Sequence, residues 1–561
     1  MSRGCNIAFY RSDISPKQCL GCQISSPAHL VSATLPTTKP ASMERLPLST
    51  VRHPDPDNAV KASVKDWPDN NEELLDFSPD PKNKQPENFW HLKDAFEGVQ
   101  IFGGTGSGKS SGSGQAIARA FLEANLGGLV LTAKTDEVLA WKQYAKEAGR
   151  ESDLLIVEQG APLRFNFLRY ELRRPGAGAG HTENLVNLFC SILEAAERKQ
   201  GQSGGNDSYW QRTLKQLLRN AIDLAILAAD DVDLTSLYRI ITSAPRSIAE
   251  AADEKWQSDS VCFTLIEHSK DRAKQKGRVH DYELTKDYWL KEFPGLAVET
   301  RSVIVSTFTS MADCFLRGML RELFCTDLNF QPEDTFNGRI IILNLPVKEY
   351  NELGQFAQVL FKFVWQRAVE RRIPAGISRA QAEKTIRPVF LWADESQFFV
   401  NSYDALFQST ARSSRACTVY LTQNLPSYLA TFSGANSRAQ AESFLGNLQT
   451  KIFHANGDPT TNNWAADSIG RTRQVQFYGG MSEGTGAKGG GGGMNQSAGG
   501  SQVFEYLIQP QEFTMLRTGG EECDLKVDGI VFQGGRRWMV SSKTVKTAQN
   551  FIRHVFPQMK Q

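Results

Sequence analysis

A glycine-rich octapeptide, G-G-T-G-S-G-K-S over residues 103–110, contains the residue types best suited to hold phosphates. It has the pattern G-x-x-x-x-G-K-[ST], in which glycines let successive backbone N–H groups curl around a phosphate. The start of a following helix would add its positive dipole end. Lys109 is predicted to contact the β- and γ-phosphates, and the Ser110 hydroxyl to bind Mg²⁺. The motif therefore predicts a site for ATP with Mg²⁺.

The alternative for this octapeptide is a merely flexible loop of glycine and serine. The apolar run V-Q-I-F before it predicts a strand, and the amphipathic run after it predicts a helix. This strand–loop–helix unit is the context that a phosphate-binding loop requires, and it argues against a flexible linker. The residues predicted to bind the nucleotide are Gly103, Gly104, Thr105, Gly106, Ser107, Gly108, Lys109, Ser110 and Ser111.

An apolar run that ends in two acids, P-V-F-L-W-A-D-E over residues 388–395, is the second motif. A buried strand would deliver these acids to the carboxyl edge of a sheet, where phosphates bind in such folds. Asp394 is predicted to hold Mg²⁺, directly or through water, and Glu395 to orient and partly deprotonate the attacking water. Exposed acids often follow strands, so this motif alone is weak evidence for a metal site. It becomes stronger evidence because the chain also contains the phosphate loop.

Polar residues around the later apolar run C-T-V-Y-L-T-Q could complete the site. Gln423 ends this predicted strand, where its amide either contacts the γ-phosphate or bonds to backbone; the spacing favours neither role. Arg412 or Arg415, in the turn before the strand, either stabilises transition-state charge in a neighbouring subunit or is a solvated loop residue. The predicted catalytic residues are Lys109, Glu395, Arg412 and Gln423.

Contact with DNA would depend on local basic stretches, because the formal net charge of +1 gives no field over the whole chain. One stretch contains Lys270, Arg272, Lys274, Lys276 and Arg278, and another contains Arg536 and Arg537 beside Trp538. A short basic run is usually a solvated face, which is the favoured interpretation here. Grooves that track phosphates do use such residues together with aromatic ones.

The order of predicted elements places the two motifs in an α/β sheet. From Val99 the order is strand, helix, strand, helix, strand, which implies parallel strands joined by crossover helices. Helical spacing then dominates until strands resume at G-R-I-I-I-L-N-L-P. We predict an all-α domain over residues 176–325, inserted into a P-loop nucleotide-binding domain over residues 91–175 and 326–561.

Two further segments have biased compositions. Residues 1–90, rich in Pro, Ser, Asp and Asn, predict a poorly ordered arm, and the glycine-rich tract 479–500 predicts a flexible loop. Within the arm, Cys19 and Cys22 form a CxxC pair that no second pair completes, which favours loose thiols over a zinc site. Met43 is an alternative start that would remove both cysteines.

The bulk composition indicates a soluble globular protein, with 40% hydrophobic and 22% charged residues. A chain of 561 residues is expected to form two or more domains. No run approaches the roughly 18–20 apolar residues that span a bilayer, and the first residues lack the apolar core of a signal peptide. We therefore expect a cytoplasmic protein, or one that is peripheral at the inner membrane through a partner.

Further segments support a resemblance to a known family. In the segment LVLTAKTDEVLAWKQYAKEAGRESDLLIVEQGAPLRFNFL, the turn with Lys134, Asp136 and Glu137 resembles a D-x-K-G-E-like turn, although Phe167 replaces a proline. The stretch LWADESQFF…STARSSRACTVYLTQN combines the acidic pair, an arginine turn and a strand ending in glutamine. FLGNLQTKIFHANGD and IQPQEFTML follow in the same order. From about residue 98 to residue 513 the chain resembles the type IV coupling proteins, the TraG/TraD-type ATPases of conjugative DNA transfer.

This resemblance implies a RecA-like nucleotide-binding domain with an inserted all-helical domain, assembled as a ring of six copies. Such rings move single-stranded DNA, with attached protein, toward a secretion channel, and the helical domain meets the relaxase or relaxosome. Arg412 takes the place of the family's arginine, while Arg415 stands where a small glycine is expected. Family members usually begin with transmembrane helices, which this sequence does not show. An ATPase that delivers protein effectors to a secretion channel, and a soluble DNA translocase with a non-conjugative role, remain alternatives.

Overall fold

The central element of the molecule is a nine-stranded sheet. The computed structural model describes residues 66–197, 207–374, 376–432, 436–483, 494–541 and 546–558. The strand order is β15-β12-β9-β3-β8-β7-β4-β6-β5. The seven strands from β9 to β5 are parallel, whereas β12 pairs antiparallel with β9 and with β15. Their bounds are β3 Val99–Phe102, β4 Gly127–Leu131, β5 Leu154–Val157, β6 Ile340–Leu343, β7 Val389–Ala393, β8 Ala416–Thr422, β9 Thr450–Phe453, β12 Lys526–Gln533 and β15 Phe551–Pro557.

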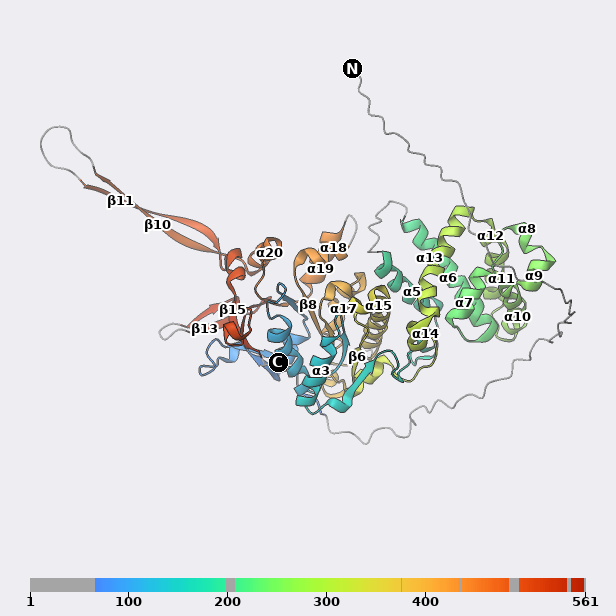
Figure 1. Ribbon diagram of the computed structural model, residues 1–561, viewed down its shortest axis with the longest axis horizontal. Helices are drawn as coiled ribbons and strands as arrows, with labels where there is room; N and C mark the ends of the chain where they lie inside the picture. Colours follow the sequence, from blue (N-terminus) through green and yellow to red (C-terminus); the bar gives the residue numbers. More distant parts are fainter. Residues whose placement is uncertain are drawn as a thin grey trace, which may run out of the picture. The chain divides into compact units, whose positions relative to one another are not determined.

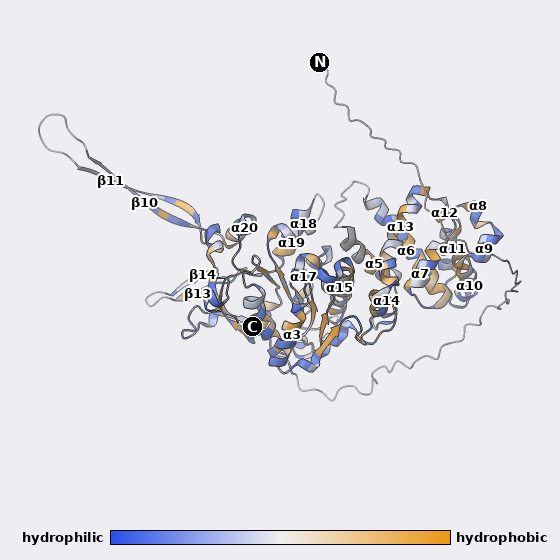
Figure 2. Ribbon diagram, in the orientation of Figure 1, coloured by the Kyte–Doolittle hydropathy of each residue, from blue (hydrophilic) through white to orange (hydrophobic). Residues whose placement is uncertain are grey.

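Both faces of this sheet are buried, which explains why its central strands are continuous apolar runs instead of alternating ones. On one face, helices α2 (Gln115–Glu123) and α3 (Asp136–Glu147) cover a core in which Trp141 stacks on Phe390 at 5.5 Å between ring centroids. On the other face lie α15 (Val347–Arg371) and α17 (Ser402–Ala411). Figure 2 shows apolar colours gathered along strands of the sheet.

Between β5 and β6 the chain forms a block of helices (Figure 1). Its two connections to the sheet run side by side, because Phe165 pairs with Leu328 in an isolated antiparallel bridge. The helices are α4 Phe167–Arg173, α5 Thr182–Glu197, α6 Asp207–Ala229, α7 Leu234–Thr242, α8 Ile248–Ala251, α9 Glu254–Asp259, α10 Val261–Gln275, α11 Val279–Asp287, α12 Phe293–Gly295, α13 Val298–Leu316 and α14 Gly318–Phe324.

The last of these helices differ from the single helix that the apolar spacing around residues 301–324 predicts. The helix breaks at Arg317, where φ is −130° and ψ is 158°, and the next helix leaves at an angle of 80°. Gly318 follows with a φ of 51°, a conformation that glycine adopts readily. In the part of the chain that the structure describes, no single helix has the length and apolarity to cross a membrane, although α13 and α14 together meet those two criteria.

The glycine-rich tract differs from the flexible loop predicted over residues 479–500. Strands β10 (Arg471–Glu483) and β11 (Met494–Tyr506) form a long antiparallel hairpin, so both ends of the tract are paired backbone. The Tyr478 ring lies over Gly499, so an aromatic side chain covers a strand position that has none of its own. Residues 484–493 lie outside the described part.

The described end of the predicted N-terminal arm is also ordered. Strand β1 (Glu73–Asp76) pairs with β2 (Phe89–His91), and the rings of Phe77 and Trp90 are buried against the sheet domain. Composition alone predicts disorder here because the few aromatic anchors are outnumbered by polar residues. Cys19, Cys22 and Met43 lie outside the described residues.

The remaining elements are short and surround the sheet. They are η2 Pro86–Asn88, α1 Leu92–Ala95, η4 Glu151–Asp153, η6 Tyr288–Glu292, η7 Pro332–Asn337, α16 Arg379–Thr385, η8 Ser396–Phe398, α18 Leu425–Thr431, α19 Ser437–Gly446, α20 Pro459–Ile469, η9 Pro510–Met515, η10 Glu521–Cys523, β13 Trp538–Ser541 and β14 Lys546–Gln549.

Candidate active site

The loop that follows β3 is fixed by the strands on both sides of it. The Gly103 N–H donates to the Thr422 carbonyl at the end of β8 over 3.3 Å. The Gly104 N–H donates to the Ala455 carbonyl just beyond β9 over 2.9 Å. Because β3 lies between β8 and β9, the loop begins at the carboxyl edge of the parallel strands, where ligands bind in open α/β sheets.

Glycine is required at Gly108, near the end of this loop. Its φ is +80°, and an added Cβ would lie 2.5 Å from a side-chain carbon of Val527. The chain then enters a π-helical turn, η3 (Ser110–Gly114), which continues into α2. The first N–H groups of a helix have no partner within it, and they therefore point toward the place where a phosphate would bind.

Ser110 and Asp394 meet across the site, as the sequence predicts for a shared Mg²⁺. The Ser110 hydroxyl donates to the Asp394 carboxylate over 2.5 Å, and Asp394 is 4% exposed at the end of β7. A hydroxyl and a carboxylate oxygen are hard oxygen donors of the kind that Mg²⁺ prefers, so this donor set fits the ion. Over the described residues there is no cluster of three or more His, Cys, Asp or Glu that could hold a metal by itself. Mg²⁺ usually takes only one or two carboxylates from the protein and its other ligands from water and substrate phosphates.

Glu395 has an uncommon backbone conformation. Its φ and ψ are both 46°, in the left-handed region that non-glycine residues rarely adopt. Its N–H donates to the Asp394 carboxylate over 2.8 Å, which holds the turn in place. Residues in this region cluster at functional sites, because the surrounding structure must compensate for their strain.

The Glu395 carboxylate accepts contacts from two cations and two amides. Lys109 Nζ and Lys134 Nζ each lie 3.5 Å from its Oε1 atom. Gln397 donates to Oε2 over 3.0 Å and Gln423 to Oε1 over 3.3 Å. Burial by itself raises the pKa of Glu395, but Lys109, the two amides and Lys134 outweigh it, so that the pKa is lowered. The group is therefore an ionised carboxylate at neutral pH.

Gln423 connects this carboxylate to the phosphate loop. Besides its bond to Glu395, its side-chain oxygen accepts a hydrogen bond from the Thr105 hydroxyl over 3.4 Å. Its backbone carbonyl accepts from the Asn456 amide over 2.9 Å. The alternative in which the Gln423 side chain bonds only to backbone therefore does not describe the structure, and the amide lies between the loop tip and the acid.

Two residues that spacing alone did not assign to the site follow β4. Glu137 accepts hydrogen bonds from the Ala133 N–H over 3.2 Å and from the Lys134 N–H over 3.1 Å, and these bonds shape the turn that presents Lys134. Burial, then the charge of Asp394, raises the pKa of Glu137 well above its usual value. The available signal was a lysine directly after an apolar strand, at the same sheet edge as the acids.

Arg412 lies away from the other predicted catalytic residues. It precedes β8, whose first residues pair with the first residues of β7, so it occupies the amino edge of the sheet, opposite the phosphate loop. Its side chain is 57% exposed and pairs with Glu97 over 3.0 Å. Arg412 consequently does not reach the site of its own chain.

Arg415 is a buried residue whose contacts hold neighbouring segments together. It is 3% exposed, has a φ of 53°, and donates to the Ile386 carbonyl over 2.9 Å and to the Asn70 side chain over 2.6 Å. Its guanidinium also lies over the Phe96 ring at 5.1 Å. Of the two arginines that the sequence left as alternatives, only Arg412 is available at the surface.

The basic stretches considered for DNA contact are engaged in other interactions. Arg536 pairs with Asp94 over 2.8 Å and lies 4.2 Å over the ring of Trp538, which is buried. Arg272 of α10 pairs with Asp230, directly after α6, over 2.5 Å, and Lys276 pairs with the same aspartate. The ion pairs of the first stretch lie at the surface, in agreement with a solvated face, whereas the Arg536 side chain is only 15% exposed between Asp94 and Trp538.

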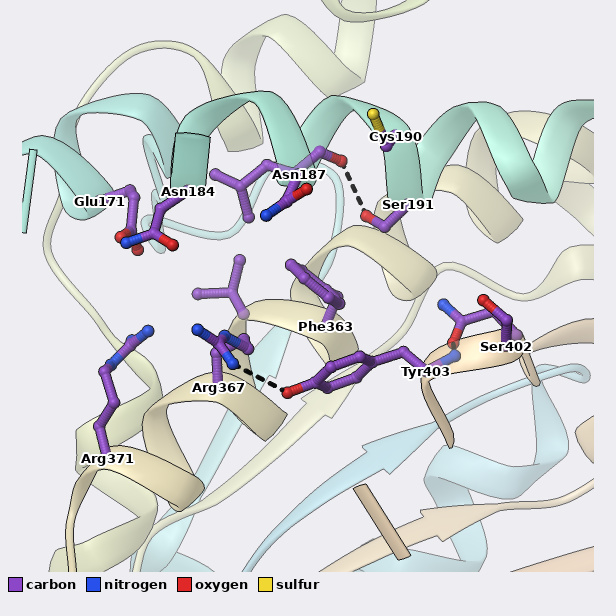
Figure 3. Close-up of a pocket in the computed structure, with 13 residues that line it drawn as sticks. Glu171, Asn184, Asn187, Cys190, Ser191, Phe363, Arg367, Arg371, Ser402 and Tyr403 are labelled. Carbon is purple, nitrogen blue, oxygen red and sulfur yellow. Dashed lines mark hydrogen bonds between the residues drawn. The ribbon is translucent and has the colours of Figure 1, made fainter. Parts of the chain in front are cut away.

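A separate cavity of about 280 Å³ lies where the helical block meets the sheet domain (Figure 3). Polar side chains of α5, such as Asn187 and Ser191, face Arg367 of α15, which donates to the Tyr403 hydroxyl over 3.2 Å. None of the lining residues belongs to the phosphate loop or to the acidic pair. This cavity is thus distinct from the candidate nucleotide site.

Structural comparison places the fold among solved coupling proteins. The unbound conjugative coupling protein TrwBdeltaN70 matches with a TM-score of 0.51 at 14% identity, over 84% of this chain and 88% of that one. TrwB in complex with the GTP analogue GDPNP gives the same values. TrwB with ADP and Mg²⁺ gives a TM-score of 0.50, also at 14% identity and over the same shares of the two chains. The predicted fold class, an α/β RecA-like sheet with a helical insertion, is confirmed.

Sequence comparison gives two family matches. The family described as the TraM recognition site of TraD and TraG matches residues 388–517. The family described as type IV secretory system conjugative DNA transfer matches residues 57–396. No curated protein matches the chain. Because the second match covers more than half of the sequence, the chain belongs to the type IV secretory system family of conjugative DNA transfer.

Proposed function

We propose that this chain is an ATP-hydrolysing motor that moves single-stranded DNA, with attached protein, toward a secretion channel. The observation that carries the proposal is a set of contacts at one edge of the sheet, in which buried Lys109 meets buried Glu395 and the Ser110 hydroxyl meets buried Asp394. A buried lysine, a hydroxyl–carboxylate pair and an ionised second acid are the parts that phosphoryl transfer to water requires. Family membership and the nucleotide complexes of TrwB support the same conclusion.

Each part has a role that follows from its position. The backbone from Gly103 to Ser111 would surround the phosphates, and Lys109 would leave Glu395 to contact the β- and γ-phosphates. Ser110 and Asp394 would hold Mg²⁺, whose charge would offset that of the phosphates. Glu395 would then accept a proton from the attacking water.

Gln423 is suited to report the state of the site. Its amide lies between Thr105 in the loop and Glu395, so a γ-phosphate entering this space would compete for its contacts.

We infer that the chain acts as a ring of six copies, because Arg412 could then contact the nucleotide of a neighbour. The helical block, predicted as an all-α domain over residues 176–325, would meet the relaxase or relaxosome. Channel proteins would place the ring at the inner membrane.

ATP hydrolysis should rise when single-stranded DNA is added. The test measures phosphate release by the purified chain with and without circular single-stranded DNA, and uses Lys109→Ala as the inactive control. Absence of hydrolysis under both conditions would refute the motor. A hydrolysis rate that DNA does not change would instead favour an ATPase that delivers protein effectors.

Lys134→Ala is expected to lower kcat about tenfold, because a charge-assisted contact is worth about 1.5 kcal/mol and that amount is about tenfold in rate. Lys134 helps to lower the pKa of Glu395, so its loss raises that pKa. The base must be ionised, and the rate should therefore begin to fall at a higher pH than in the wild type. The pH profile of kcat measures this shift.

Lys142→Ala is the matched control, since Lys142 is an exposed lysine on α3. Lys134→Arg should restore most of the rate, as it keeps the charge. If kcat of Lys134→Ala begins to fall at the same pH as kcat of the wild type, Lys134 does not act through Glu395.

A further inference from the structure

The β10–β11 hairpin has two faces of different chemistry. Side chains that are paired across the strands share a face, and neighbours along a strand alternate between faces. One face, called here the aromatic face, carries the pairs Arg471 with Tyr506, Arg473 with Phe504, Val475 with Gln502, and Phe477 with Gly500. The opposite face carries mainly polar pairs, such as Thr472 with Glu505.

Large apolar side chains on the aromatic face are exposed to solvent. Phe477 is 87% exposed, Phe504 61% and Val475 51%. Figure 2 shows apolar colours on this hairpin well away from the sheet core. Grouped exposed apolar side chains usually mark a binding surface, whereas single ones need no explanation.

The arginines of this face lie on its rings. Arg471 lies 4.2 Å over Tyr506, and Arg473 lies 5.3 Å over Phe504. Arg471 is partly neutralised by Asp467 at 3.1 Å, but Arg473 has no carboxylate partner among the described residues. Glu505, which lies between Phe504 and Tyr506 in β11, is on the opposite face. The aromatic face therefore presents both rings that can stack and positive charge.

The root of the hairpin is packed beside the phosphate loop. Strand β10 follows α20, where the Trp464 ring contacts Phe102 at 5.6 Å and Phe453 at 6.2 Å between centroids. Phe102 is the last residue of β3, directly before the loop. The Leu507 N–H donates to the Gly470 carbonyl over 3.0 Å and closes the base of the hairpin. The hairpin therefore starts close to the end of β3 and extends outward from beside α20 (Figure 1).

We infer that the aromatic face binds single-stranded DNA by stacking its bases on Phe477, Phe504 and Tyr506. Aromatic rings interleaved with arginine are the combination that proteins use to hold single strands without reading sequence. Successive rings on one face of a strand are separated by multiples of about 6.7 Å. This is about twice the 3.4 Å rise per base of a strand in B-DNA, which suits bases that are splayed apart.

Single-stranded DNA fits this face better than a second copy of the chain or another protein. A protein partner would bury Phe477 in an apolar contact and would require an acid opposite Arg473. In single-stranded DNA the bases can stack on the rings while a phosphate pairs with Arg473, and every base has a face on which a ring can stack. The inference rests on the proposed function, and it adds a contact point for the moving strand.

The test uses the full chain and a fluorescently labelled oligo(dT), with a duplex of the same length as comparison. The double variant Phe477→Ala/Phe504→Ala should weaken oligo(dT) binding by at least about tenfold, since each stacked ring contributes about that factor or more. Hydrolysis without DNA should be unchanged, because neither ring touches the nucleotide site. Tyr478→Ala is the matched control: Tyr478 is 65% exposed and next to Phe477, but on the opposite face.

The outcomes separate this inference from the proposed function. Weakened oligo(dT) binding in the double variant alone supports the aromatic face. Equal loss in Tyr478→Ala, or no loss in the double variant, overturns it, while DNA-stimulated hydrolysis by the wild type would still stand. Loss of oligomers in the double variant with normal DNA binding would assign the face to a second copy. A wild type that neither binds oligo(dT) nor responds to it would refute both proposals.

Discussion

Replacing Glu395 by Gln is expected to lower kcat for ATP hydrolysis about a thousandfold, within the range for loss of a general base. The variant keeps the size of the side chain, and its amide can still bond to Gln397 and Gln423. It removes the ionised carboxylate that Lys109 and Lys134 help to maintain. ATP binding should persist, because phosphate contacts come from the loop. Phosphate release and equilibrium binding of a fluorescent ATP analogue measure the two effects separately.

Two controls accompany this variant, one expected to keep full activity and one expected to lose both activity and nucleotide binding. Glu442→Gln changes an acid that pairs with Arg438 on the surface of α19, and it should leave hydrolysis unchanged. Lys109→Ala should lose nucleotide binding as well as hydrolysis. Normal turnover by Glu395→Gln would show that the proton of the attacking water goes elsewhere, and it would remove Glu395 from the mechanism.

Arg412→Ala is also expected to lower hydrolysis about a thousandfold, the scale on which an arginine finger acts. Arg412 lies at the sheet edge opposite its own phosphate loop, so it can act only on the nucleotide of another copy. Nucleotide binding by the variant should be normal. The comparison is Arg438→Ala, an exposed arginine that also pairs with a glutamate.

Mixing two inactive variants tests this trans arrangement directly. In a mixed ring, an Arg412→Ala copy retains an intact phosphate loop and receives the arginine of a Lys109→Ala neighbour. Hydrolysis should therefore reappear and pass through a maximum at intermediate ratios. Two variants that stay inactive at every ratio would contradict the trans role. Normal hydrolysis by Arg412→Ala alone would reduce this arginine to the partner of Glu97.

Local patterns predicted the parts of the site that depend on local sequence. The phosphate loop and the strand that ends at Asp394 are continuous motifs, and the structure brings Ser110 and Asp394 together as predicted. Parallel strands buried on both faces have an unmistakable apolar run. The α/β class and the order of its elements followed from these runs.

The parts that sequence missed depend on contacts between distant segments. Lys134 belongs to the site only because Glu395, 261 positions away, faces it across the sheet edge. Arg415 resembles its neighbour Arg412 in sequence, and only burial against Asn70 and Phe96 distinguishes the two. The strand ends of the glycine-rich tract depend on pairing across the hairpin, which composition does not reveal.

The strand order of the sheet has a consequence for synthesis of the chain on the ribosome. Strands β3, β4 and β5 are made first, yet none of them neighbours another. β5 and β4 must wait for β6 to emerge after the whole helical block, and β3 must wait for β8 and β9. The nascent chain therefore carries three apolar strands with open edges through most of translation, a state that favours aggregation. Early capture of these strands by a chaperone would protect a sheet that can close only when the chain is nearly complete.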